Sequence, residues 1–380
     1  MFARTFFYTL ICILFTGNPV IGRASSDTES NTQAGETASL AEMQEMVSAA
    51  SSANPQWYGP ITGPEARTGR TIAILAEDLR NGGILGVSHG IQEAAQALGW
   101  RVKVFDAGGS DQGRRQAAQN AFDSKPEGLI LNGADMVAMS EMLQPFVDSD
   151  IPIVGWHVAA VAGAIDGPVA INVSTDPLEV ARITAMAAIV ASGGKAGVII
   201  FTDSNYEIAM SKANAMADLV RSCSGCRLLE MQDVAIANSA SIMPGRTREL
   251  INKYGNAWTH ALAINDIYFD YAVPELIQTS TSTDQLQLLS AGDGSSAAFL
   301  RIQSDTYQTS TVAEPLNLHG WQLVDELNRL MENTAVTGYV FPPHLMTGNN
   351  ISDQMSSDFN YDPNNGYRDR YLKIWGRKKR

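Results

Sequence analysis

Short apolar runs alternate with segments of helical periodicity along most of this chain. The first run, 71–76, is apolar at almost every position, as expected for a strand buried on both faces of a parallel sheet. Similar runs recur as far as residue 341, and each is a predicted strand. The predicted strands are 71–76, 101–105, 128–131, 153–155, 169–173, 196–201, 227–232, 260–263, 285–290, 310–313 and 338–341.

Between these runs, apolar residues recur every three or four positions, which indicates helices packed on a sheet. Strands that alternate with helices form βαβ units and a parallel sheet. The series runs once from residue 71 and again after Pro168, so the pattern predicts an α/β fold with two doubly wound parallel-sheet lobes and a ligand cleft between their strand ends. The predicted helices are 39–53, 84–98, 113–123, 137–147, 177–191 (capped by Asp176), 206–221, 245–254, 267–278, 295–303 and 318–331.

Composition and charge exclude one class of partner. A length of 380 residues with 45% hydrophobic residues is ordinary for a two-lobed α/β protein. The net charge of −13 and the isoelectric point near 4.8 argue against a nucleic-acid-binding surface, which needs clustered Lys and Arg. We expect the one basic run, 377–380, to be a solvated tail.

The first 24 residues have the pattern of a secretory signal peptide. Arg4 precedes an apolar run, 5–15, that is too short to span a bilayer, and small residues suit cleavage after Ala24. Cys12 follows an isoleucine, where a lipid-attachment motif would have a small residue. We therefore expect an exported, periplasmic protein without a lipid anchor.

Two cysteines, Cys223 and Cys226, remain after that cleavage. Outside the cytosol such a pair is expected to be oxidised. A redox dithiol would open a helix after a strand, whereas this pair stands between a predicted helix and a predicted strand. A zinc site would need two further ligands nearby. The placement favours a local structural disulfide.

Candidate ligand-binding residues of the first lobe follow its predicted strands. Glu77, Asp78 and Asn81 come after the first strand, where ligands meet an open α/β sheet, although the same residues also suit a capped turn. Trp156 and His157 follow the strand at 153–155 and could offer a sugar an apolar face and a hydrogen bond. A core tryptophan beside a satisfied histidine is the alternative.

The second lobe offers a matching set. Asn205 and Tyr206 follow the strand at 196–201, and Asn265 follows the strand at 260–263. Asp266 is interpreted as a helix N-cap, which leaves Asn265 as the better ligand candidate. Asp293 stands between two glycines after the strand at 285–290. The surrounding letters match a dinucleotide loop, but Asp293 would then face a pyrophosphate with like charge, and no spacing of the five histidines indicates a metal site.

Five stretches taken together resemble the type I periplasmic sugar-binding proteins of ABC transporters, of ribose-binding type. The resemblance covers residues 69–352, and its stretches are 71–81, 90–99, 151–154 (Ile-Pro-Ile-Val), 263–266 (Ala-Ile-Asn-Asp) and 291–294 (Ala-Gly-Asp-Gly). By this resemblance, the binding roles fall on Glu77, Asn81, His157, Asn265, Asp293 and Glu314.

This sequence also departs from the family's pattern. The family's paired aromatic residues fall on Gly83 and Ile84, so that stacking would come from Trp156 or Tyr206. A second-lobe arginine falls on Met210, close to Lys212.

The resemblance implies a periplasmic binding protein fold of type I, with a hinge of three crossings near Ser174, Glu314 and 338–343. We assign 69–174 plus 315–340 to lobe I and 175–314 plus 341–352 to lobe II. Residues 25–68 are expected to form a flexible N-terminal extension, and 353–380 a C-terminal tail.

The implied function is capture of a monosaccharide or sugar alcohol between two closing lobes and delivery to an ABC transporter permease, by a monomer without cofactor, metal or enzymatic activity. An exported sugar sensor that docks on a chemoreceptor or sensor kinase is the alternative with the same fold. A hydrolase using Asp293 and Glu314 is a third interpretation. The excess of acceptors over cations in the candidate site argues against sugar phosphates or sugar acids as ligands.

Overall fold

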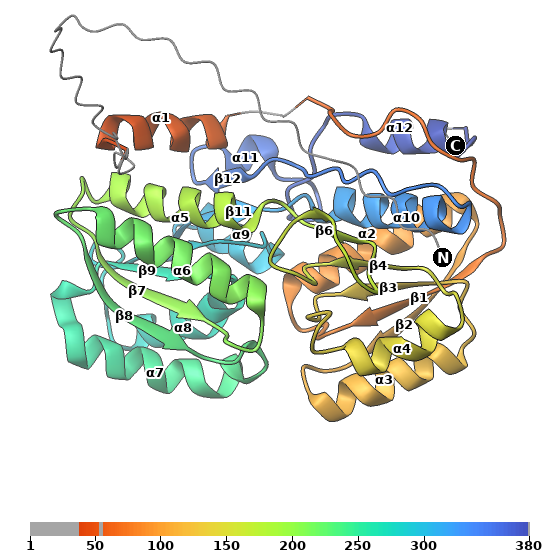
Figure 1. Cartoon of the computed structure of the whole chain (residues 1–380). Coiled ribbons are helices and arrows are strands. Elements are labelled where there is room, and N and C mark those ends of the chain that lie inside the picture. The colour runs from red at the N-terminus through yellow and green to blue at the C-terminus, as the bar shows by residue number, and fades with distance from the viewer. Residues whose placement is uncertain (1–37, 53–55, 379–380) are drawn as a thin grey trace, which may run out of the picture. The chain divides into compact units, whose positions relative to one another are not determined.

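The structure, a computed structural model, describes residues 38–52 and 56–378, so the predicted signal peptide lies outside the described residues. Its first sheet has the strand order β2-β1-β3-β4-β6-β5, parallel except for β5, and is covered by α2, α3, α4 and α10 (Figure 1). The bounds are β1 Thr71–Ala76, β2 Arg101–Asp106, β3 Gly128–Asn132, β4 Ile153–Trp156, β5 Gly163–Ala164, β6 Ile171–Val173, α2 Gly82–Leu98, α3 Asp111–Asp123, α4 Ser140–Asp148 and α10 Leu316–Met331.

The second sheet has the order β12-β11-β10-β9-β7-β8, and only β12 is antiparallel to its neighbour. Its bounds and those of its helices are β7 Gly197–Thr202, β8 Arg227–Asp233, β9 His260–Ala263, β10 Gln287–Ser290, β11 Gln308–Ala313, β12 His344–Thr347, α5 Pro177–Ala191, α6 Glu207–Ser222, α7 Ser239–Tyr254, α8 Ile267–Gln278 and α9 Ser296–Gln303. The predicted α/β fold of two parallel-sheet lobes is thus confirmed.

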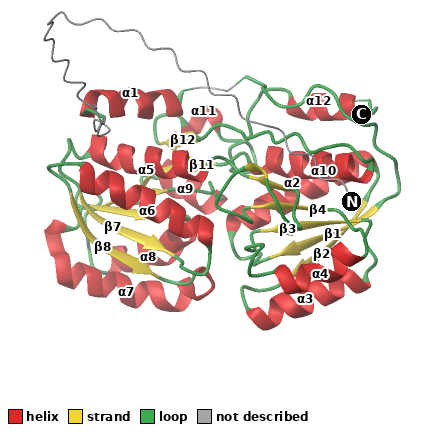
Figure 2. Ribbon diagram, in the orientation of Figure 1, coloured by secondary structure: helices red, strands yellow, loops and turns green. Residues whose placement is uncertain are grey.

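Alternating side chains explain why helices cover both faces of the first sheet (Figure 2). Successive residues of a strand point to opposite faces. Ile72 and Ile74 of β1 accordingly join the core beneath α2 and α10, whereas Ala73 and Leu75 join a separate core beneath α3 and α4. All four side chains are buried, which is why the strand is apolar throughout.

The chain passes between the two lobes three times before its last strand, β12. It leaves β6 for α5, leaves β11 for α10, and leaves α10 for β12. The predicted strand at 338–341 is wrong, because pairing begins only at His344. Pro342 and Pro343 have no N–H to donate to a ladder, and Phe341 is apolar because it packs in the core beneath α10.

Segments at both ends of the described chain pack on the lobes. The helix α1, Leu40–Ser51, buries Met43 in the core of the second lobe, so this part of the predicted flexible extension is ordered against α5. The helix α11, Ile351–Gln354, crosses the predicted start of the C-terminal tail at residue 353, and the tail itself contains a second helix, α12 Tyr367–Ile374. Trp375, directly after α12, stacks on Trp321 of α10 at 5.3 Å between ring centroids. These aromatic contacts hold α12 and Trp375 on the first lobe.

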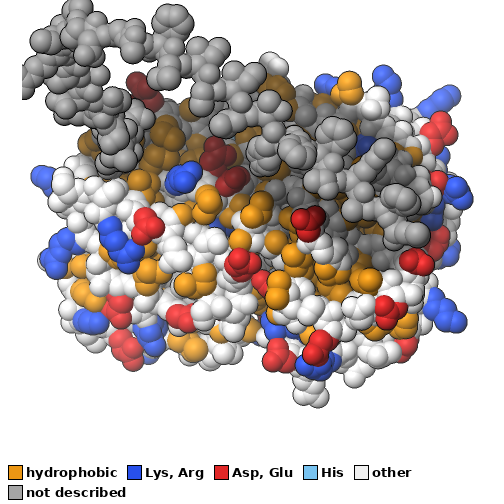
Figure 3. Space-filling view, viewed as in Figure 1, with side chains coloured by type: hydrophobic (Ala, Val, Ile, Leu, Met, Phe, Trp, Pro, Cys, Tyr) orange, Lys and Arg blue, Asp and Glu red, His pale blue; other side chains and the backbone are white. Residues whose placement is uncertain are grey.

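Charged side chains are mixed on the face of the molecule in Figure 3, where Lys and Arg alternate with Asp and Glu and form no continuous basic area. The helices in the described part of the chain all fall short of the length and apolar character that a membrane span requires.

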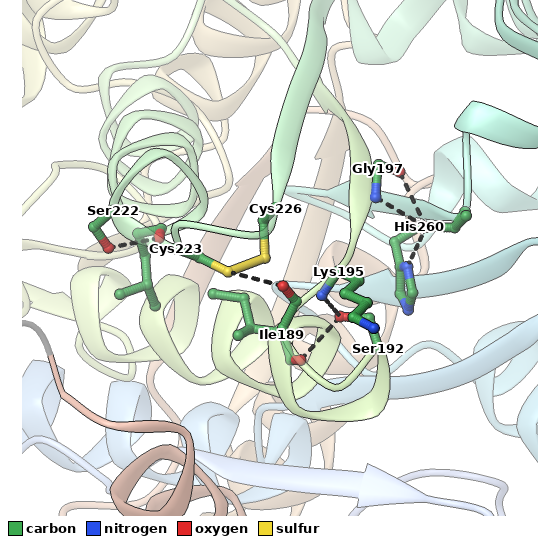
Figure 4. Close-up of a disulfide and its surroundings, with 11 residues drawn as sticks. Ile189, Ser192, Lys195, Gly197, Ser222, Cys223, Cys226 and His260 are labelled. Atoms are coloured by element: carbon green, nitrogen blue, oxygen red, sulfur yellow. Dashed lines mark hydrogen bonds between the residues drawn. A yellow bond between two sulfur atoms is a disulfide. The ribbon is translucent and has the colours of Figure 1, made fainter.

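Cys223 and Cys226 lie in the turn between α6 and β8, as predicted, and their sulfur atoms are bonded (Figure 4). Cys223 Sγ also lies 3.6 Å from the carbonyl oxygen of Gly194, at the turn that leads into β7. The disulfide is therefore local, and it lies away from the loops at the carboxyl ends of the strands.

Candidate functional site

The loops at the carboxyl ends of the strands in both lobes surround one cavity. Its lining from the first lobe is Glu77, Asp78, Asn81, Ile84, Gly109, Gly133, Trp156 and His157. Its lining from the second lobe is Tyr206, Ile208, Ala209, Lys212, Ile236, Ala237, Ile264, Asn265 and Asp293. Eight of the ten predicted ligand-binding residues are in this set, whereas Asn205 and Glu314 are not.

Glu77 joins the two lobes. It is 2% exposed, and both of its oxygens accept hydrogen bonds from the guanidinium of Arg114 at 2.5–3.0 Å. The hydroxyl of Tyr206, on the second lobe, donates to Oε1 of Glu77 at 2.9 Å. Burial, followed by the charge of Glu77, raises the pKa of Tyr206 well above its usual value, so the hydroxyl remains a donor. Most of the acceptor capacity of Glu77 is therefore used within the protein.

Asp78 is also paired. Nη2 of Arg80 donates to its Oδ2 at 2.6 Å, and Nε of Arg80 donates to its Oδ1 at 2.9 Å. The hydrogen bond to Asp78 raises the pKa of Arg80 above its usual value. Asp78 itself is buried, with a side chain that is 5% exposed, whereas the side chain of Arg80 is 58% exposed.

Asn81 has both of the roles considered for it. Its Oδ1 accepts from the backbone N–H of Gly83 at 2.9 Å and caps α2. Its side chain also lines the cavity, and no described residue accepts a hydrogen bond from its Nδ2. The amide nitrogen is thus a free donor that faces a ligand.

Trp156 and His157 form a stacked pair with ring centroids 3.7 Å apart and planes 9° from parallel. Trp156 is 1% exposed, and its Nε1 donates to Nδ1 of His319 at 3.2 Å. His157 has a φ of 53°, in the left-handed region that residues other than glycine adopt uncommonly, although histidine does so more often than most. The stack holds the imidazole at the cavity, between an indole and the polar groups of the second lobe.

Glu314 lies beneath the cavity and supports His157. It is fully buried, and its Oε1 is 2.8 Å from Nε2 of His157. Burial acts to raise the pKa of Glu314, but the charge of His157 and the hydrogen bond from it outweigh burial and hold that pKa well below its usual range. Glu314 therefore orients the imidazole, and it is not in the cavity lining.

Asp293 is the acceptor of the second lobe. Its Oδ2 accepts from Nδ2 of Asn265 at 2.7 Å, and its Oδ1 lies 3.9 Å from Nδ1 of His157. Burial raises the pKa of Asp293 to about 6, although the positive charges of His157 and Lys212 oppose this shift. With neutral amide support and no direct cation within hydrogen-bonding distance, Oδ1 has acceptor capacity left for a ligand.

Asn265 lines the cavity and also takes the capping role that was predicted for Asp266. Asn265 Oδ1 accepts from the backbone N–H of Ile267 at the start of α8, whereas Asp266 makes no side-chain cap there. Instead, Asp266 Oδ2 accepts from the N–H groups of Gly294 and Ser295 at 2.8 and 3.1 Å. Asp266 thus holds the loop that carries Asp293. The sequence did not reveal this because the two loops are distant along the chain and adjacent only in the sheet.

Asn205 is turned away from the cavity. It is exposed, and its Nδ2 donates to Oδ1 of Asp203 at 2.7 Å within the same turn. Sequence analysis also missed Arg114, which is the partner of Glu77 although it does not line the cavity. It follows β2 at the start of α3, and nothing in the local sequence indicates its contact with Glu77. Four isoleucines form an apolar wall of the cavity: Ile84, Ile208, Ile236 and Ile264. Of these, the sequence indicated only Ile84, at a position where the resembled family has an aromatic ring.

Two glycines permit the close contact between the lobes. A Cβ added at Gly83 would overlap the carboxylate of Asp293. A Cβ added at Gly109 would lie 2.8 Å from the Cβ of Ala237, and Gly109 has a φ of 71° that disfavours other residues. Larger side chains at either position would hold the lobes apart.

His157, Asp293 and Glu314 could each offer one ligand atom to a metal, with these atoms within 4.8 Å of one another. The two ring nitrogens of His157, however, face different carboxylates, Nε2 toward Glu314 and Nδ1 toward Asp293. This arrangement suits a chain of hydrogen bonds, because metal ligands converge on one point.

Comparison with protein families matches residues 72–335 to the periplasmic binding protein domain. No curated protein matches the chain significantly. An ABC sugar transporter subunit from Rhodobacter sphaeroides superimposes with a TM-score of 0.63, 19% identity and coverage of 74% of this chain and 99% of that one. A solute-binding protein from Bacillus halodurans, with bound myo-inositol, superimposes with a TM-score of 0.65 and 14% identity, and the match covers 75% of this chain and 97% of that one. The 5-methylthioribose transporter solute-binding protein from Thermotoga lettingae superimposes with a TM-score of 0.66 and 16% identity, and the match covers 81% of this chain and 94% of that one.

These structures share the two-lobed fold, and the family match spans most of the chain. The family consists of binding proteins, in agreement with the prediction that the chain is not an enzyme. The predicted resemblance is confirmed, and the chain belongs to the family of proteins with a periplasmic binding protein domain.

Proposed function

We propose that this protein is the periplasmic solute-binding component of an ABC importer, exported by residues 1–24 and acting as a monomer without a cofactor. It captures a monosaccharide or sugar alcohol between its lobes as they close, and delivers the ligand unchanged to a membrane permease. Hinge closure around a ligand is the usual motion of two-lobed binders.

The observation that carries this proposal is the cavity between the lobes, with hydrogen-bonding groups from both sides. Asn81 and His157 are contributed by the first lobe, and Asn265 and Asp293 by the second. Ligand hydroxyls would donate to Asp293 and accept from Asn81, and a charge-assisted hydrogen bond contributes about 1.5–3 kcal/mol. A ligand that bonds to both lobes favours the closed form over the open one.

The named ligands of similar structures support the class of ligand. Besides the proteins above, a solute-binding protein from Agrobacterium vitis contains bound allitol. Because these proteins are 16% identical to this chain or less, they favour polyhydroxylated ligands in general and no individual one.

A panel of sugars and polyols tests the proposal. One class should raise the melting temperature of the purified protein, because a ligand that binds only the folded state stabilises it. Absence of a shift with every member of the panel, and with the acids introduced below, would exclude the proposed function. Recovery of a chemically altered ligand would contradict binding without chemistry.

Asp293→Ala should abolish that shift, since it removes the acceptor that faces the cavity. The exposed Asp284, on the same lobe, makes no side-chain hydrogen bond within the described residues, so Asp284→Ala serves as the control. Equal ligand affinity of the two variants would remove Asp293 from the binding site.

A further inference from the structure

The cavity has fewer available acceptors than its acidic residues suggest. Glu77 is bonded to Arg114 and Tyr206, and Asp78 is bonded to Arg80. Each of these two carboxylates therefore has its own cation. The excess of acceptors that argued against acidic ligands disappears once these internal pairs are removed from the count.

Lys212 is the opposite case, a cation without a direct ion pair. It belongs to α6, is 3% exposed and lines the cavity. Its Nζ donates to the carbonyl oxygen of Ala291 at 2.9 Å. Throughout the described chain, no carboxylate oxygen lies within 4.0 Å of this nitrogen. An ammonium has three N–H donors, so two remain for a ligand.

Asp293 is close enough for its charge to act on Lys212, but it makes no direct ion pair with it. Asp293 Oδ2 accepts from Asn265, Oδ1 lies 3.9 Å from Nδ1 of His157, and neither oxygen lies within 4.0 Å of Nζ of Lys212. A buried charge without a direct partner is costly, and the hydroxyl of a neutral ligand would solvate the ammonium but not neutralise it. A carboxylate does both, because it accepts hydrogen bonds and carries the opposite charge.

We propose that Lys212 binds the carboxylate of a small hydroxylated acid, so that the ligand class is the sugar acids and related polyhydroxy acids. This inference rests on the proposed function and narrows its ligand. The hydroxyls of the acid donate to Asp293 Oδ1 and accept from Asn81 Nδ2, whereas its carboxylate faces Nζ of Lys212. The isoleucines of the wall contact its carbon chain.

Matched pairs of ligands test this proposal by titration calorimetry on the purified protein. D-gluconate is compared with D-glucitol, and D-glycerate with glycerol, since each pair has the same number of carbons and differs at the carboxylate. The acid should bind at least about tenfold more tightly than its neutral partner in at least one pair. Equal or tighter binding of the neutral polyols overturns the role of the carboxylate while the proposed function stands.

Lys212→Met keeps the length of the side chain and removes its charge. It should abolish the preference for the acid, because the acid loses at least about tenfold more affinity than its neutral partner, whereas a purely structural role would weaken both equally. Lys195→Met, at an exposed position, is the matched control and should retain the preference. If Lys212→Met does not fold, Lys212→Gln replaces it. The comparison of paired ligands on the unsubstituted protein does not depend on either variant, and it decides whether the carboxylate of the ligand strengthens binding.

Discussion

The loops after β1 and after β10 both bring carboxylates to the cavity, but they hold them differently. In the first lobe, Glu77 and Asp78 are each bonded to an arginine. In the second lobe, Asp293 is held by the neutral amide of Asn265. Because an ion pair uses up the lone pairs that a ligand would need, the first loop contributes structure and the second contributes acceptor capacity. An acidic residue at a strand end is thus a ligand contact only when nothing else in the protein neutralises it.

Removal of the cation from the first loop should have the largest effect. Arg114→Ala leaves Glu77 buried and unpaired, and we expect a loss of about 3–5 kcal/mol in the free energy of unfolding. Arg80→Ala is the comparison variant: Asp78 is buried as well, but Arg80 is 58% exposed against 15% for Arg114, so water reaches that pair and the loss should be smaller. Urea denaturation measures both. Similar losses for the two variants would contradict the difference in burial, and Glu77→Gln in the Arg114→Ala background should recover part of the stability.

The pH dependence of stability should identify Asp293 as the carboxylate without a close cation. Its pKa is raised to about 6 from an ordinary 3.8, so between these values the folded protein retains a proton that the unfolded chain releases. The contribution of Asp293 to stability is then greatest below pH 4 and falls as the pH rises toward 6, by at most about 3 kcal/mol. The measurement is the free energy of unfolding of the unsubstituted protein and of Asp293→Asn between pH 4 and 7. If the difference in free energy of unfolding between the two proteins does not change with pH, Asp293 does not titrate in this range as proposed.

The hydrogen bond between the loops should have the smallest effect. Tyr206→Phe removes the hydroxyl that donates to Glu77 across the lobes. Ligand affinity should fall by about 0.5–1.5 kcal/mol, since the closed form loses one hydrogen bond. The melting temperature without ligand should change little, because each lobe keeps its own core. Calorimetric titration of the ligand identified above gives the affinity, and no decrease would show that the bond does not favour closure.

The sequence predicted the layers of the fold well because their signal is local. The ends of β1, β9 and α8 agree with the predicted 71–76, 260–263 and 267–278. The helix α12 was missed because it is short and buries only Tyr367, Tyr371 and Ile374, within a stretch rich in turn-forming residues. The periodicity that indicates a helix was too weak there.

The candidate site was predicted in position but not in detail. Parallel strands bring their carboxyl ends to one edge, so Glu77, His157 and Asp293 could be placed near one another. The partners of these residues come from other loops, as Arg114 does for Glu77. Pairing between distant segments decides which polar groups remain free, and a single sequence does not contain that information.

The stacked pair of Trp156 and His157 has a practical consequence. Of the six tryptophans in the chain, this is the one that lines the cavity, and its indole lies 3.7 Å from an imidazole. Imidazole rings quench indole fluorescence on contact, and the quenching depends on their stacking and protonation. The site therefore contains an intrinsic optical reporter, through which occupancy can be followed in real time without a label, a tag or an engineered chromophore.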